Sequence, residues 1–200
     1  MNTSLAQRAL PMSNAKFRDI LLVIGGSLLV AAAAQVKIPF WPVPMTLQTL
    51  AVLLVGGAYG ARLGAATLGL YMLEGALGLP FLAGAKASIF DAKIAFLPYS
   101  SFGYLLGFIL AAWVVGRIAQ AGKTSSAWNM IGATLFGTVV VYLPGSIWLA
   151  IWAYISQHMT AIDAMQFAYI KGIDPFIPAD ILKATIAGLG LAAVWSGVKQ

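Results

Sequence analysis

Long uncharged stretches, separated by isolated charged residues, dominate the pattern of this chain. Four of them lie at 20–36, 38–61, 94–116 and 124–162. Each reaches or exceeds the ~17–25 apolar residues that a helix needs to cross ~30 Å of hydrocarbon. Two further apolar stretches, at 63–79 and 179–198, contain charged residues. Backbone polar groups in hydrocarbon must be bonded within their own segment, and no alternating barrel pattern is present, so the spans are expected to be helical.

These stretches predict an all-α integral membrane protein with six transmembrane helices, near 19–36, 46–60, 62–79, 99–119, 127–153 and 179–198. The uncharged stretch at 124–162 is long enough to hold two helices. However, Trp128 and Trp152 would lie ~36 Å apart along one helix, about the separation of the two aromatic belts of a membrane protein. One long helix, kinked at Pro144, is therefore favoured.

Composition strengthens the membrane interpretation and excludes several classes of function. Hydrophobic residues make up 60% of the chain and charged residues 9%, against roughly 25% charged residues in soluble domains. The chain has no cysteine and one histidine, His158, so disulfides, cysteine nucleophiles and a metal site are not expected. The thinly spread basic residues do not form a nucleic-acid-binding patch. HExxH, GxSxG and P-loop motifs are absent, so we expect no catalysis and no cofactor.

The distribution of lysine and arginine predicts the orientation. With the N-terminus inside, seven of these residues lie on the inner side of the membrane and four on the outer side, which favours two cytoplasmic termini. The chain is expected to form one membrane domain over 1–200, with a cytoplasmic segment at 1–18. A cleaved signal peptide is an alternative, because Arg8, Lys16 and Arg18 precede an apolar run that ends in alanines 31–34. Five spans would then remain.

Three ionisable residues inside the predicted spans are candidates for chemistry, because a charge at membrane depth is costly. Asp180 and Lys183 are three positions apart on one helical face and can pair; the alternative is a helix cap and a lysine that extends to the membrane surface. Glu74 is a candidate ligand acceptor or a partner for an outer lysine. It can also be a carboxylate that reaches water at the membrane surface.

The connector at 38–45, which is followed by Thr46 to Thr49 at the start of the second predicted helix, contains three prolines within six residues, so it cannot be helical. Phe40 and Trp41 give it an apolar face, and Thr46 and Gln48 provide hydrogen-bonding groups. This connector is either a lid over a small-molecule pocket or a rigid link between helices. Small residues also recur every four positions along several helices, and such stripes allow close helix packing in lipid or docking of a partner.

Four motifs resemble those of the BioY family, the biotin-binding S components of energy-coupling factor (ECF) transporters. They are PVPMTLQTL at 42–50, YMLEGALGLPFLA at 71–83, GYLLGF at 103–108 and PADILKA at 178–184. The resemblance implies a six-helix, S-component-like bundle in the bacterial cell membrane that binds biotin near the outer side. It also implies as partners a transmembrane coupling protein and two ATPase subunits. It assigns ligand contact to Asp180 and Lys183.

The expected site combines these residues with nearby aromatic and polar side chains. The resemblance places the biotin ring against apolar walls and its polar groups against a small set of side chains. The complete set is Asp180, Lys183, Gln48, Thr46, Tyr104, Tyr71, Trp41, Phe40, Glu74 and Lys86.

Two departures from the family pattern leave parts of this expectation open. The loop at 84–102 diverges from the glycine-rich family sequence, so Lys86 or Lys93 is a candidate for the biotin carboxylate, or is only solvated. The AxxxA coupling pattern of the first helix is matched loosely, by Ser27 and Ala31. The alternative function is a solo transporter or facilitator for biotin or a related vitamin; an intramembrane hydrolase lacks a nucleophile–base pair.

Overall fold

The computed structural model describes residues 4–86, 88–89, 98–122 and 126–198, and most of them are helical. Five helical stretches are long and apolar enough to cross a membrane. They are α2 (Ala15–Gln35), α3 (Gln48–Ala76), α4 (Phe102–Gln120), α5 (Ala127–Ser156), and a final stretch that combines α6 (Ala161–Gly172), η2 (Asp174–Phe176) and α7 (Ile177–Val198). Of the six expected spans, the described residues show five span-like stretches, one of which contains two of the expected helices.

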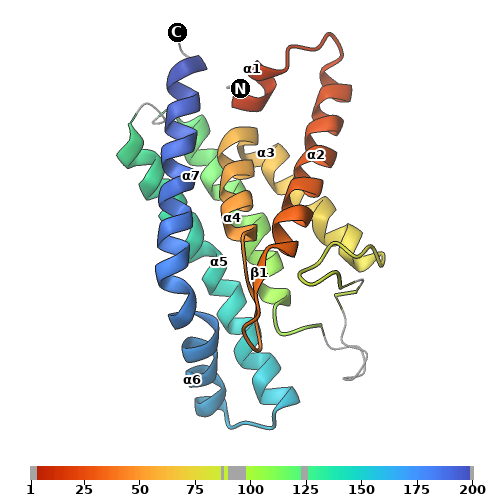
Figure 1. Ribbon diagram of the computed structural model, residues 1–200, viewed down its shortest axis with the longest axis vertical. Helices are drawn as coiled ribbons and strands as arrows, with labels where there is room; N and C mark the ends of the chain where they lie inside the picture. Colours follow the sequence, from red (N-terminus) through yellow and green to blue (C-terminus); the bar gives the residue numbers. More distant parts are fainter. Residues whose placement is uncertain (1–3, 87, 90–97, 123–125, 199–200) are drawn as a thin grey trace.

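The difference arises at Gly60, where the two helices expected at 46–60 and 62–79 join into α3. Gly60 has φ +79° and ψ 174°, which is not helical, and only glycine adopts this backbone region readily. The two arms of α3 therefore run in different directions, drawn in orange and yellow in Figure 1. The side chain of Gln120, at the end of α4, accepts a hydrogen bond from the Ala61 backbone N–H at 3.2 Å.

The long uncharged stretch forms one helix, α5, which confirms the expectation of a single span there. The helix continues through Pro144. In contrast, the residues between the spans expected at 127–153 and 179–198 are not simply a connecting loop, because they contain α6 and η2. Thr160 begins α6 by accepting a hydrogen bond from the Asp163 backbone N–H at 3.2 Å. At twelve residues, α6 is too short to be recognised from its apolar length.

Small residues bring the helix backbones together. A Cβ atom added at Gly56 of α3 would lie 2.8 Å from the Ala112 backbone of α4, and one at Gly107 of α4 would lie 2.6 Å from the Val141 carbonyl of α5. A Cβ atom at Gly188 of α7 would meet the backbone of α5. The small-residue stripes at these positions therefore serve packing within the chain, as expected for helices associating in lipid.

The two ends of the bundle are built differently. At one end, α1 (Leu5–Ala9) buries Leu5 in a cluster with Trp195 of α7, and both chain termini lie at this end in Figure 1. The other end contains α6 and a short hairpin of β1 (Lys37–Ile38) and β2 (Met45–Thr46). This hairpin confirms that the proline-rich connector is extended.

Two side chains attach the connectors at the hairpin end to the bundle. Ser100, just before α4, donates its hydroxyl hydrogen to the Pro42 carbonyl at 2.7 Å. Gln35, the last residue of α2, donates to the carbonyls of Phe81 and Leu82 and accepts from the backbone N–H of Ala85. The connectors are thereby held over the ends of the helices.

We predict that Gly60→Ala destabilises the fold, because alanine at this φ and ψ costs about 1–3 kcal/mol and its Cβ would meet the Gln120 side chain. Thermal unfolding in detergent measures the loss. Gly69→Ala is the matched control, because Gly69 lies within the helical part of α3 and its added Cβ would meet nothing within 4 Å. Equal melting temperatures for the two variants would contradict this role of Gly60.

Candidate functional site

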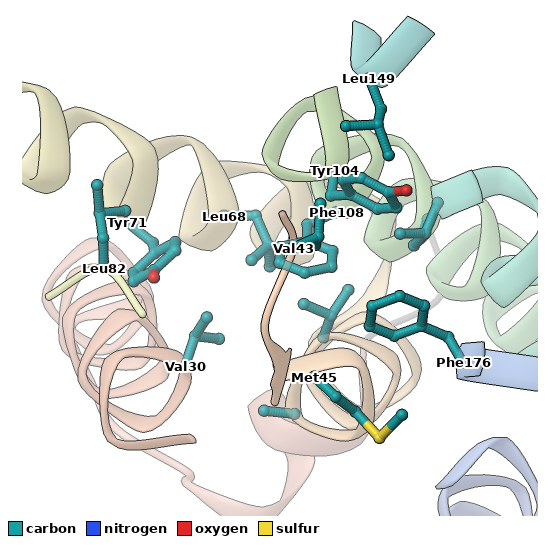
Figure 2. Packing of buried hydrophobic residues seen from close by; sticks show 14 of the residues in the cluster. Val30, Val43, Met45, Leu68, Tyr71, Leu82, Tyr104, Phe108, Leu149 and Phe176 are labelled. Atoms are coloured by element: carbon teal, nitrogen blue, oxygen red, sulfur yellow. The ribbon is translucent and has the colours of Figure 1, made fainter. Parts of the chain in front are cut away.

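A cavity that is partly open to solvent lies at the hairpin end of the bundle. Its walls come from the hairpin, both arms of α3, the loop after α3, η2, the first two turns of α4 and α7, and the middle of α5. Figure 2 shows Val43 of the hairpin between Tyr71 on one side and Tyr104 and Phe108 on the other. Elements distant in sequence therefore form one enclosed, largely apolar site.

An ion pair lies in the wall formed by α7. The Lys183 ammonium group donates to Asp180 Oδ1 at 2.8 Å, and the Tyr142 hydroxyl donates to Asp180 Oδ2 at 2.8 Å. Asp180 is 4% exposed and Lys183 is 8% exposed. The carboxylate therefore pairs with side chains rather than capping the helix, and the lysine turns inward rather than extending to the membrane surface.

A second polar group lies where the hairpin meets α3. Thr46 donates its hydroxyl hydrogen to Gln48 Oε1 at 3.1 Å, and Gln48 Nε2 donates to the Tyr71 hydroxyl at 2.9 Å. The Tyr71 hydroxyl in turn donates to the Phe81 carbonyl at 3.1 Å. Gln48 and Tyr71 are both buried. This chain of hydrogen bonds fixes the Gln48 amide, which retains one N–H for a ligand.

Tyr104 fits into a slot between α5 and the end of α6. Its ring lies where Cβ atoms would stand at Gly145 and Gly172. Its hydroxyl donates to the Gly172 carbonyl at 2.8 Å. Tyr104 therefore contributes an aromatic surface to the cavity, while its polar end is already bonded.

Lys86 contributes a cation at the exposed side of the cavity. It is exposed in the loop after α3 and lines the cavity, and its ammonium group lies 3.7 Å from the centre of the Tyr99 ring. Lys93, the other candidate in this loop, lies outside the described residues. Lys86 thus places positive charge at the opening, as the sequence suggested.

Three of the expected residues do not line the cavity. Trp41 is 62% exposed and packs edge-on against Trp152 and Phe167. Phe40 packs against Phe176 at 6.2 Å between ring centres. Both lie in the loop between β1 and β2, in which Val43 and Pro44 line the cavity instead. Glu74 lies on α3 outside the cavity and contacts Ser27 of α2.

Several lining residues were not predicted from the sequence. Tyr142 is the most important, because it bonds Asp180; its only sequence signal was a tyrosine within the long uncharged stretch of α5. Thr49, Ser101, Phe108 and Phe176 also line the cavity. Phe108 belonged to the quoted GYLLGF motif, and Thr49 followed Gln48 directly, so both had a signal in their neighbours.

The arrangement suits a ligand with an apolar body and a few polar groups. Among the described residues, Lys183 donates to Asp180 alone, so two of its three N–H groups remain available, and Asp180 retains acceptor capacity. No group of three or more histidine, cysteine, aspartate or glutamate side chains comes together in the part of the chain that the structure describes. The cavity therefore presents fixed hydrogen-bonding groups between aromatic walls, as small-molecule sites do.

Comparisons with known proteins agree with this description. The family model described as "BioY family" matches residues 6–200. A "Probable biotin transporter BioY" of Pyrococcus horikoshii is 33% identical over 172 residues, covering 86% of this chain and 93% of the relative. A "Biotin transporter BioY" of Thermotoga maritima is 34% identical over 161 residues, covering 80% and 86%. A "Biotin transporter BioY" of Rhizobium etli is 30% identical over 190 residues, covering 90% and 94%.

A solved structure has the same fold. The "S-component for biotin from an ECF-type ABC transporter" superposes with a TM-score of 0.72 and covers 94% of this chain and 95% of that one, at 22% identity. At this identity the likeness supports the fold of the bundle and no more. The five span-like stretches are therefore arranged as in an S component.

We predict that the buried pair behaves as one unit in unfolding experiments. Lys183→Met leaves Asp180 without its cation, and removing one partner of a buried pair costs about 3–5 kcal/mol. Asp180→Asn, which leaves an unpaired buried lysine, should also destabilise. The double variant Asp180→Asn/Lys183→Met should lose less stability than Lys183→Met alone. Free energies of unfolding in detergent test this, and losses that simply add would show that the two residues act independently.

Proposed function

Because this chain belongs to the BioY family, a family of transporters rather than enzymes, we propose that it is the membrane subunit that captures biotin for uptake. The relatives named as biotin transporters align with this chain over most of their own length. One observation carries the proposal. The PADILKA segment places a buried Asp180–Lys183 pair in the wall of a largely apolar cavity.

The chemistry of biotin matches the two polar groups of this cavity. Its ureido ring has two N–H donors and one carbonyl acceptor, and its valerate chain ends in a carboxylate. Asp180 can accept from the ureido N–H groups, and Lys183 or Gln48 can donate to an oxygen. Tyr71 and Tyr104 provide aromatic surface for the bicyclic ring, with Thr46 holding Gln48 in place.

The carboxylate end is assigned to the open side of the cavity. Lys86 lies there with its ammonium group against Tyr99, and attraction of an anion does not require its burial. Trp41 and Phe40 are assigned to the hairpin tip, where they cover the site from outside instead of contacting the ring. Glu74 is left out of the ligand site.

The membrane arrangement follows from the same proposal. We place both arms of α3 across the membrane as separate spans that meet at Gly60, which gives six crossings by one domain over 1–200. Both termini then lie in the cytoplasm, with the end that carries α1, and the cavity opens outward in the cell membrane. The chain has no P-loop, so transport into the cell would use a coupling protein and two ATPase subunits.

We predict that the purified protein binds biotin and that Asp180→Asn or Lys183→Ala weakens the affinity at least tenfold, equivalent to about 1.4 kcal/mol. Each change removes a charge-assisted hydrogen bond from the cavity wall. Isothermal titration calorimetry with biotin, thiamine and riboflavin measures binding and selectivity. Lys16→Ala, an exposed lysine at the start of α2, is the matched control. Unchanged affinity in both site variants would overturn the site, and stronger binding of another vitamin would overturn the ligand.

We also predict that uptake depends on the ATPase module. Cells that lack the coupling protein and ATPase subunits should bind biotin through this chain without accumulating it against a gradient. Coexpression of the module should restore accumulation, measured as uptake of radiolabelled biotin. Uphill uptake by the chain alone would instead favour the solo transporter.

A further inference from the structure

Glu74 is an acidic residue that the proposed biotin site does not use. It is the only glutamate in the chain and lies in the last turns of α3. Its Oε1 atom lies 3.2 Å from the Ser27 hydroxyl oxygen of α2. Its Oε2 atom is buried and has no hydrogen-bond partner. A carboxyl group therefore stands in a helix–helix contact with a single polar neighbour.

The α2 side of this contact is buried, whereas Glu74 as a whole residue is partly exposed. Ser27 is fully buried and stands eight residues before the end of α2, about 12 Å along the helix axis. Its neighbours on α2, Gly26 and Val30, are buried as well. Burying an ionised carboxylate without a compensating partner costs several kcal/mol.

No cation described in the structure compensates Glu74. The two ion pairs found among the described residues join Arg18 to Asp19 and Lys183 to Asp180. The remaining charged groups on the elements packed against this arm of α3 lie elsewhere. Arg62 of α3 is twelve residues away, about 18 Å along an ideal helix, and α2 carries no charge between Asp19 and Lys37.

The described cations of the neighbouring elements have other contacts. Arg117, the one charged residue of α4, lies in its last turn beside Trp113. Lys37, after α2, has its ammonium group at Gly84, and Lys86 stacks on Tyr99. Tyr71, one turn before Glu74, is the titratable neighbour on α3, and its hydroxyl donates to the Phe81 carbonyl.

The single hydroxyl hydrogen of Ser27 limits which protonation state of Glu74 fits this contact. Its hydroxyl oxygen lies 2.9 Å from the Ile24 carbonyl and 3.2 Å from Glu74 Oε1. The single hydroxyl hydrogen cannot serve both acceptors, and the shorter contact takes it. Ser27 then presents a lone pair to Glu74, and a hydrogen on Glu74 Oε1 completes a hydrogen bond to it, whereas an ionised Glu74 has to take the Ser27 hydrogen from the Ile24 carbonyl.

We propose that Glu74 is a proton-binding site in the α2–α3 contact. The bound proton completes a chain of hydrogen bonds in which Glu74 donates to Ser27 and Ser27 donates to the Ile24 carbonyl. Loss of the proton draws the Ser27 hydrogen from the Ile24 carbonyl to the carboxylate and leaves a negative charge in an apolar contact. The α2–α3 contact is therefore stable with the proton bound and weakens as pH rises and Glu74 ionises.

The contact between Glu74 and Ser27 also lies close in sequence to a residue of the cavity wall. Glu74 follows Tyr71 by three residues, so the two lie on neighbouring turns of one face. Tyr71 lines the cavity, and Val30 of α2 belongs to the same hydrophobic cluster. Ionisation of Glu74 would loosen α2 from the part of α3 that carries Tyr71.

Because Glu74 is the single glutamate, the test needs no substitution. Protein labelled with ¹³C at the glutamate side-chain carboxyl gives one signal, whose chemical shift distinguishes acid from carboxylate. We expect the acid shift at neutral pH in detergent or bilayers and a single transition to the carboxylate shift at alkaline pH. A carboxylate shift at neutral pH would overturn the proposal.

A second measurement compares thermal stability across pH. The wild-type protein should lose stability on passing from neutral to alkaline pH, relative to Glu74→Gln, which is neutral at every pH and retains a donor. Asp163→Asn, an exposed acid of α6, is the control and should follow the wild-type curve. Parallel curves for wild type and Glu74→Gln would argue against a bound proton. Neither measurement involves biotin, so a negative result would contradict the proton site without contradicting the proposed function.

Discussion

The close approach of helix backbones at glycines is the constraint on which the rest of the structure depends. Lipid provides no hydrophobic drive for helices to associate, so van der Waals contact has to hold them together. Gly103 and Gly107 bring α4 against the backbone of α5, and Gly116 brings it against the bend of α3 at Gly60. Helix α4 is thereby held between its neighbours. The same approach creates the slot for Tyr104 and fixes one wall of the cavity.

Two acids that lie in helix contacts, the buried Asp180 and the partly buried Glu74, are accommodated in different ways. Asp180 has a lysine three residues later on the same helix and a tyrosine hydroxyl from α5, so its charge is matched locally. Glu74 has only a serine hydroxyl, whose hydrogen is directed to a backbone carbonyl. The first arrangement presents charged donors and acceptors to a ligand. The second favours a neutral carboxyl group and acts on the packing of α2 against α3.

Much of the fold could be predicted because it depends on length and hydrophobicity. The single helix at α5 followed from an uncharged run and the spacing of its tryptophans, and the boundary near Gly60 fell where α3 bends. Helix α6 was missed because a twelve-residue amphipathic helix has no such length signal. Trp41 was expected in the cavity because aromatic residues often line such sites, yet the hairpin directs it outward to Trp152 and Phe167.

The sequence by itself determined the membrane class and the helical content, and it placed Asp180 and Lys183 on one helical face, because these depend on composition and on neighbours within one helix. Only the tertiary structure decided that Tyr142 bonds Asp180, that Gln48 bonds Tyr71, and that Glu74 faces Ser27. Each of these contacts joins residues on different helices or on the two arms of α3. Their formation depends on helix rotation and tilt, which close packing at the glycines sets and which no local pattern encodes.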